Sequence, residues 1–135
     1  MRMVKAIPAL PVRNIEQAVE FYRDRLHFVI GHRDDSFAIV TRSDVEIHLW
    51  AAFDETWRNR RSNPSTHPVV SGAESFIAGT ASCRVEVIGI EDLYEEYRTS
   101  QVLYDPKTVV ERQPWGTREF PVLDQERNLI TFYER

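Results

Sequence analysis

The sequence predicts an α+β fold built from two βαβββ modules, whose strands form a curved mixed sheet shaped like a cup. The first observation is a repeat: a strand pattern, a helix pattern and three further strand patterns occur in residues 1–50 and again in 81–135. The second is that residues 51–80 follow no clean period. We therefore expect one domain over 1–135, with module 1 at about 1–50, a connecting loop at 51–80 and module 2 at about 81–135.

The spacing between matching positions supports the repeat. Val12 to Val87 is 87 − 12 = 75, and His48 to Thr131 is 131 − 48 = 83, so the difference of 8 falls in the loops. A lone four-stranded half would expose one sheet edge and one apolar face. The two halves must therefore pack or pair.

Module 1 begins with an apolar segment at 6–12 and continues with a helix. Asn14 is placed to cap this helix, and Gln17 lies three residues on, as in a capping box. One apolar stripe follows at helical spacing: Ile15, Ala18, Val19, Tyr22 and Leu26. Three extended runs separated by turn residues then predict strands at 27–32, 36–41 and 45–51.

Module 2 repeats this order. The alternating run 82–89 predicts a strand, and a second helical stripe follows it: Ile90, Leu93, Tyr94 and Tyr97. Three further strands are predicted at 107–114, 117–124 and 128–134. The predicted order of elements in each half is therefore β-α-β-β-β.

Composition narrows the classes of function. The 135 residues are 42% hydrophobic and carry a net charge of −4 with a pI near 5.6, which argues against a nucleic-acid surface and suits a cationic ligand. The sole cysteine, Cys83, excludes a disulfide within the chain and fits a small buried strand residue. No apolar run approaches the length of a membrane span, so we expect a cytoplasmic protein without membrane partners.

Strand parity predicts two different sheet faces, because successive side chains of a strand point to opposite sides. In the run 45–50, one face holds Val45, Ile47 and Leu49, and the other holds Glu46, His48 and Trp50. The runs 82–87 and 129–133 divide in the same way. The apolar face should receive the helices. The mixed face is either ordinary solvent-exposed surface or a cup with aromatic walls that binds a small molecule.

The segments 11–31 (PVRNIEQAVEFYRDRLHFVIG) and 113–134 (QPWGTREFPVLDQERNLITFYE) resemble the vicinal oxygen chelate superfamily of glyoxalases, bleomycin-resistance proteins and dioxygenases. Within it, GIEDLYEEY followed by QPWG and REF is closest to the bleomycin-resistance proteins. The resemblance covers residues 4–50 and 81–135. The loop 51–80 is longer than the connection in that family, so it could roof the crevice and select a smaller ligand.

Enzymes of this superfamily hold a divalent metal on four inward strand positions, which align here with Ile7, His48, Ser82 and Thr131. Of these only His48 ligates well, and one imidazole with two hydroxyls makes a weak site. We therefore expect no metal or other cofactor. A displaced site that adds Glu46 or Glu86 is the alternative.

The resemblance implies a homodimer that sequesters a bleomycin-like cationic antibiotic in crevices at the subunit interface, without catalysis. In that family the N-terminal strand can exchange between subunits near a proline, and Pro8 and Pro11 match that region. One alternative is a metal-dependent enzyme of glyoxalase, dioxygenase or fosfomycin-transferase type, which would use His48. Another is a structural or regulatory dimer in which the aromatic cup is incidental.

Ligand contacts follow from this resemblance and from position. Trp115 would stack on a heteroaromatic ligand, unless it only covers the sheet edge, and Gly116 would let backbone or ligand approach closely. Phe37 matches an aromatic residue that lines the family's crevice. The further candidates are Trp50, His48, Glu86 and, from the loop, Trp57. Carboxylates that could offset ligand charge are Asp34, Asp35, Glu46, Glu86 and Glu119.

Overall fold

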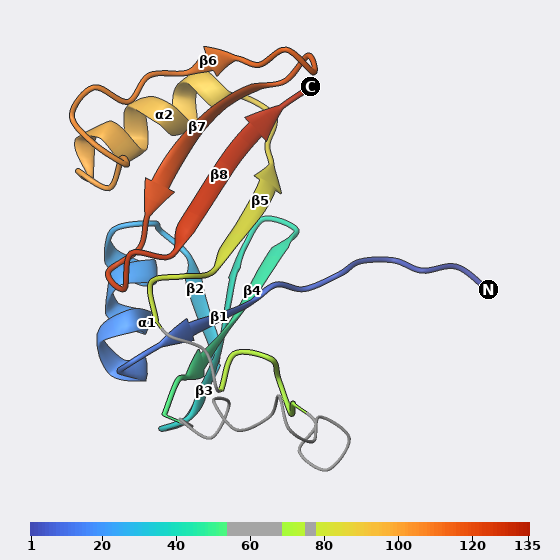
Figure 1. The fold of residues 1–135 in the computed structure, drawn as a ribbon, viewed down its shortest axis with the longest axis vertical. Coiled ribbons are helices and arrows are strands. Elements are labelled where there is room, and N and C mark those ends of the chain that lie inside the picture. Colours follow the sequence, from blue (N-terminus) through green and yellow to red (C-terminus); the bar gives the residue numbers. More distant parts are fainter. Residues whose placement is uncertain (54–68, 75–77) are drawn as a thin grey trace, which may run out of the picture.

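A computed structural model describes residues 1–53, 69–74 and 78–135 (Figure 1). Module 1 comprises β1 (Ala9–Val12), α1 (Ile15–Asp24), β2 (Val29–Arg33), β3 (Phe37–Arg42) and β4 (Val45–Ala51). Module 2 comprises β5 (Ser82–Glu86), α2 (Ile90–Thr99), β6 (Glu111–Arg112), β7 (Arg118–Leu123) and β8 (Leu129–Glu134). The predicted β-α-β-β-β order is confirmed in both halves.

Each module forms one four-stranded mixed sheet. The strand orders are β1-β4-β3-β2 and β5-β8-β7-β6, and in each sheet the first pair is parallel and the others are antiparallel. The registers repeat as well, because Ala9 lies opposite His48 in module 1 and Arg84 lies opposite Thr131 in module 2. Matching positions therefore differ by 84 − 9 = 75 and 131 − 48 = 83, the offsets that the sequence predicted.

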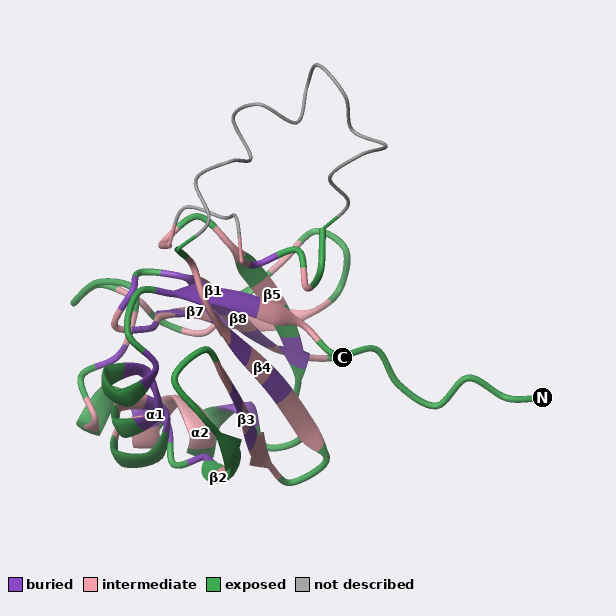
Figure 2. Cartoon of the chain, turned by 90° about the horizontal axis from the view of Figure 1, so that it is seen from below, coloured by how far each residue is buried: buried purple, intermediate pink, exposed green. Residues whose placement is uncertain are grey.

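The helices cover the apolar face of the sheets, as the parity of the strands predicted. Helix α1 packs on β2, β3 and β4, and α2 packs on β7 and β8. The Asn14 side chain accepts a hydrogen bond from the Gln17 backbone N–H at 2.9 Å, so the predicted helix cap is present. All five stripe residues of the first helix segment are buried, and Figure 2 shows the buried residues concentrated between helices and strands.

The predicted strand at 107–114 is wrong over most of its length, since only Glu111 and Arg112 pair with β7. At the outer edge of β7, the backbone hydrogen bond to the Pro121 carbonyl comes instead from the Tyr104 N–H. Pro121 has no N–H to offer a further strand at this edge. The stretch between Tyr104 and Glu111 therefore leaves the sheet.

A buried polar cluster in the β7–β8 loop joins module 2 to module 1. The carboxylate of Asp124 accepts hydrogen bonds from the Tyr22 hydroxyl at 2.9 Å and from the backbone N–H groups of Glu126 and Asn128. Asn128, fully buried, also donates to the Pro11 carbonyl of β1 at 2.8 Å. One loop thereby contacts both α1 and β1.

A second contact between modules involves Arg42 of β3 and Glu96 of α2. The Arg42 guanidinium donates to both carboxylate oxygens of Glu96, at 2.5 and 2.9 Å. The Tyr97 hydroxyl donates to the Leu26 carbonyl at 2.8 Å. These bonds hold the end of α2 against the turn that follows α1.

The connecting loop is anchored at its C-terminal end. The Gly79 N–H donates to the Asn128 side-chain oxygen at 3.1 Å, and the Leu129 N–H donates to the Ala81 carbonyl at 3.0 Å. Trp57 lies outside the described residues, so its contact with a ligand stays a prediction. Among the described residues no helix is long and apolar enough to cross a bilayer.

Tyr22→Phe should lower the free energy of unfolding by about 1–3 kcal/mol, because it removes a donor from a buried carboxylate. Burial raises the pKa of Asp124 above its ordinary value of 3.8, so this residue's contribution to stability falls as pH rises from 3.8 through the folded pKa. Because the hydrogen bond from Tyr22 lowers the pKa of Asp124, Tyr22→Phe should raise that pKa further and increase the loss of stability between pH 3 and pH 7. Urea denaturation at pH 3 and pH 7 measures both effects. Tyr104→Phe, at an exposed tyrosine, is the control, and an equal loss there would contradict the prediction.

Gly79→Ala should destabilise the fold more than Gly72→Ala. Both glycines have a positive φ, +88° and +85°, so both substitutions carry the same backbone strain of about 1–2 kcal/mol. Only at Gly79 would the new Cβ lie 2.5 Å from a backbone oxygen, that of Glu126. Thermal unfolding of the two variants isolates this clash. Equal melting temperatures would show that the loop end is not packed against residue 126.

Candidate ligand-binding site

The sheet face that points away from the helices, here called the cup face, carries an aromatic cluster in module 1. Phe37 lies opposite Trp50 in the β3–β4 pairing, with ring centroids 4.4 Å apart. The ring of Phe37 also contacts His48, at 5.0 Å and nearly perpendicular. Strand parity left the direction of Phe37 open, and the structure places it beside two other predicted contact residues.

Charged groups border this aromatic cluster. Glu46 accepts from Lys5 at 2.6 Å and contacts the Nε2 of His48 at 2.8 Å. Hydrogen bonds from Lys5 and then His48 hold the pKa of Glu46 below its usual range. On the neighbouring turn, hydrogen bonds from His32 and Ser36 lower the pKa of Asp34 to about 2. Both carboxylates therefore carry a negative charge at neutral pH.

Trp115 and Gly116 lie in the turn between β6 and β7. The turn closes through the Gly116 N–H, which donates to the Gln113 carbonyl at 2.9 Å, and the φ of Gly116 is +99°. This glycine is therefore required by the turn itself. Trp115 is 65% exposed, so much of its indole surface is open to a ligand or another chain, while its side chain hydrogen-bonds Glu119.

The cup face of module 2 is more highly charged than that of module 1. Arg84 donates to both oxygens of Glu119, at 3.3 and 2.8 Å, and its guanidinium lies 4.7 Å from the Tyr133 ring centroid. The ion pair with Arg84 lowers the pKa of Glu119. Glu86, a predicted ligand contact, is paired with Arg135 at 2.8 Å.

A hollow of about 400 Å³ opens where residues 104–111 leave the edge of β7. Its lining contains three carboxylates, those of Asp105, Glu111 and Glu119, against the single ammonium of Lys107. The hollow was not predicted from the sequence, because a continuous strand was expected at 107–114. Pro121, in the middle of β7, was the signal that could have revealed it.

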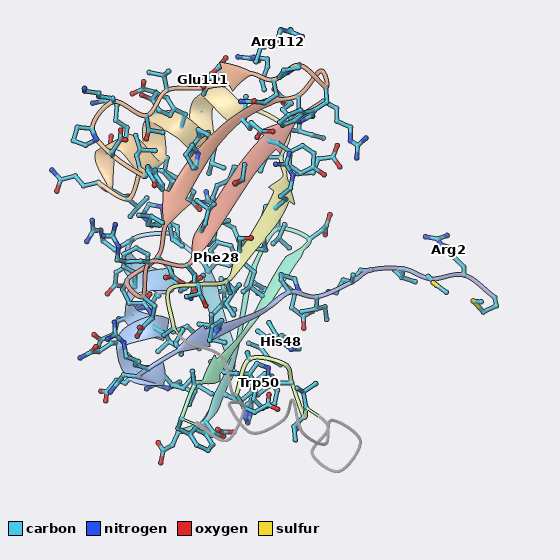
Figure 3. All side chains as sticks on the ribbon, in the orientation of Figure 1. Arg2, Phe28, His48, Trp50, Glu111 and Arg112 are labelled. Atoms are coloured by element: carbon cyan, nitrogen blue, oxygen red, sulfur yellow. The ribbon has the colours of Figure 1, made fainter. Side chains whose placement is uncertain are left out.

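The two groups of predicted contact residues do not meet within one chain. His48 and Trp50 lie at the lower end of the molecule in Figure 3, whereas Glu111 and Arg112, which precede the Trp115 turn, lie at the opposite end. Among the described residues, no hydrogen bond, ion pair or ring contact joins the module 1 cluster to Trp115, Glu86 or Glu119. The predicted contact residues of the two modules therefore lie apart within this chain.

The residues at the superfamily's metal positions do not fit a divalent ion. The set contains one imidazole, two hydroxyls and the aliphatic Ile7, and the imidazole of His48 is bonded to Glu46. Among the described residues no three His, Cys, Asp or Glu side chains are grouped so that they could hold a metal. Burial raises the pKa of the Cys83 thiol to about 11, so it is neutral at pH 7.

Comparison with known proteins gives close relatives, although no family model matches the chain. A "Bleomycin resistance protein" from Geobacillus stearothermophilus is 49% identical over 133 residues, which are 98% of each chain. A bleomycin-binding protein from Streptomyces verticillus, solved with copper(II)-bleomycin, is 25% identical with a TM-score of 0.73, over 98% of this chain and 96% of that one.

A third similar structure is a glyoxalase/bleomycin resistance protein/dioxygenase from Nocardioides, with a TM-score of 0.64 and 22% identity, over 99% of this chain and 84% of that one. At this level of identity, the likeness shows a shared fold. Identity close to one half along the whole chain is much more than a shared fold alone requires. The repeat, the two mixed sheets and these relatives together show that the chain belongs to the bleomycin resistance protein family.

Proposed function

We propose that this protein binds a bleomycin-like cationic glycopeptide in the cytoplasm and sequesters it without changing it chemically. The observation that carries the proposal is that the cup face combines an aromatic cluster with charged carboxylates, while the residues that the structure describes include no group suited to a metal, in a chain closely similar to a bleomycin resistance protein. Binding alone protects a target if the drug is held tightly enough.

Stacking is the first source of affinity. Trp50, Phe37 and the exposed Trp115 offer flat rings, and each ring that covers a heteroaromatic system contributes about 1–3 kcal/mol. The role proposed for His48 is to pack against Phe37 and keep that ring in place, and not to bind a metal. The loop residue Trp57 is proposed as a further wall of the site.

Electrostatics is the second source. The hollow of module 2 has an excess of two carboxylates over ammonium groups, and the chain as a whole carries a charge of −4. A ligand with several positive groups is drawn to such a surface, and it loses affinity as salt screens the attraction. Glu86 and Glu119 already have arginine partners, so they contribute less to a ligand than Glu111 and Asp105.

We place the complete crevice between two chains. Module 1 of one chain would supply the aromatic cluster, and module 2 of its partner would supply Trp115 and the acidic hollow. Two features support a dimer: the half-sites are separate within one chain, and residues 1–7 extend away from the body with Met1, Met3 and Val4 exposed (Figure 1). Contact of this segment with the partner chain would cover those apolar side chains.

Trp115→Ala should weaken bleomycin binding by about 1–3 kcal/mol, because an exposed stacking ring is lost. Isothermal titration calorimetry measures the affinity, and thermal unfolding checks that stability is unchanged. Trp115→Phe is the matched control and should retain most of the affinity. If Trp115→Ala binds the drug as the unchanged protein does, the tryptophan only covers the sheet edge.

Mixing two variants tests the crevice between chains. Trp50→Ala and Trp115→Ala should each bind weakly, but a heterodimer of the two combines the intact module 1 of one chain with the intact module 2 of the other. Subunit exchange should therefore restore strong binding to about one site per four chains. Calorimetry before and after exchange measures that number. If affinity stays low after exchange, the site lies within one chain.

A further inference from the structure

In the part of the chain that the structure describes, one side-chain ion pair links the N-terminal arm, residues 1–7, to the body of the chain. Among the described residues, no backbone hydrogen bond involves the arm, and the first one beyond it joins the His48 N–H to the Pro8 carbonyl. The tie is the ammonium of Lys5, which lies 2.6 Å from Glu46 on the cup face. In Figure 1 the arm runs from β1 outward, away from both sheets.

Glu46 holds this ammonium in a defined setting. One carboxylate oxygen accepts from Lys5 and the other contacts the Nε2 of His48, and the side chain is only 20% exposed. A hollow of about 440 Å³ adjoins the pair. It is lined by Val4, Lys5, Thr41, Ser43, Asp44, Val45 and Glu46. The hollow thus contains a second carboxylate and two hydroxyls, which are acceptors for N–H donors.

We infer that Lys5 occupies an ammonium-binding subsite made by Glu46 and its hollow, and that a ligand carrying a primary ammonium group takes the place of Lys5 when the arm moves away. The inference rests on the proposed function only in taking the cup face as the ligand face. It adds the chemical group that module 1 recognises and a segment of the chain that competes for it.

The occupant is replaceable for two physical reasons. Lys5 is 45% exposed, and a single ion pair so exposed contributes little to holding the arm in place. An incoming ammonium makes the same charge-assisted hydrogen bond, while the rest of its molecule reaches the aromatic cluster through the His48 and Phe37 side. A glutamate carboxylate is ionised at neutral pH, and the contact with the Nε2 of His48 remains, so Glu46 is charged when Lys5 leaves.

The repeat shows that this subsite belongs to module 1 alone. The position that matches Glu46 in module 2 is 46 + 83 = 129, which is Leu129. An apolar side chain there offers an ammonium no partner. The two modules would therefore hold different parts of one ligand, with a primary ammonium at Glu46.

The test compares Lys5→Met, Glu46→Gln and the double variant, with Arg2→Met as the matched control for loss of one positive charge from the arm. Three probes are titrated by calorimetry at low salt: spermidine, bleomycin with an aminoalkyl tail, and tail-free bleomycinic acid. Lys5→Met should raise affinity for spermidine and for the tailed drug about two- to fivefold. Glu46→Gln should abolish that gain in the double variant, and Arg2→Met and bleomycinic acid should show none.

Three outcomes would overturn the subsite: no gain in Lys5→Met, an equal gain in Arg2→Met, or a gain that survives Glu46→Gln. A gain limited to spermidine would assign the subsite to free polyamines, and one shared with the tailed drug would assign it to the drug's tail. If the unchanged protein bound neither form of bleomycin, the proposed function would fail, while the spermidine titrations would still decide the subsite. Thermal unfolding confirms that each variant is folded.

Discussion

The contact between the two modules centres on one buried carboxylate, that of Asp124, and the Arg42–Glu96 pair adds a second link. One oxygen accepts from the backbone N–H groups of Glu126 and Asn128, and the other accepts from the Tyr22 hydroxyl and the Asn128 side chain. A carboxylate removed from water is costly unless its lone pairs are filled, so the β7–β8 loop can adopt this form only when α1 is in contact. Each cup face is oriented by that contact.

On this shared frame the two modules carry different chemistry. Where module 1 has Ala9 opposite His48, module 2 has Arg84 opposite Thr131, so an aromatic cluster in one corresponds to an ion-paired surface in the other. The backbone pairing tolerates this divergence because side chains on the cup face do not pack in the core. The two modules therefore share a backbone but present faces of different chemistry.

Much of the fold could be predicted from local pattern. The Asn14 cap, both helical stripes and the inward and outward faces of the strands follow from short-range periodicity, which survives whatever the tertiary arrangement. The absence of most of the strand at 107–114 could not be predicted in this way. Its residues have strand propensity, but the neighbouring edge of β7 is blocked at Pro121. For the candidate site, the sequence and its resemblance pointed to Trp115, Phe37 and His48, but not to the acidic hollow.

The sequence by itself determined the repeat, the order of elements and which side chains share a face, because these depend on spacing along the chain. Only the tertiary structure decided that Phe37 contacts Trp50, that Lys5 reaches Glu46 and that the predicted contact residues of the two modules lie apart. These are contacts between residues far apart in sequence or on different strands. They depend on strand register and on how the buried loop at Asp124 orients one module against the other.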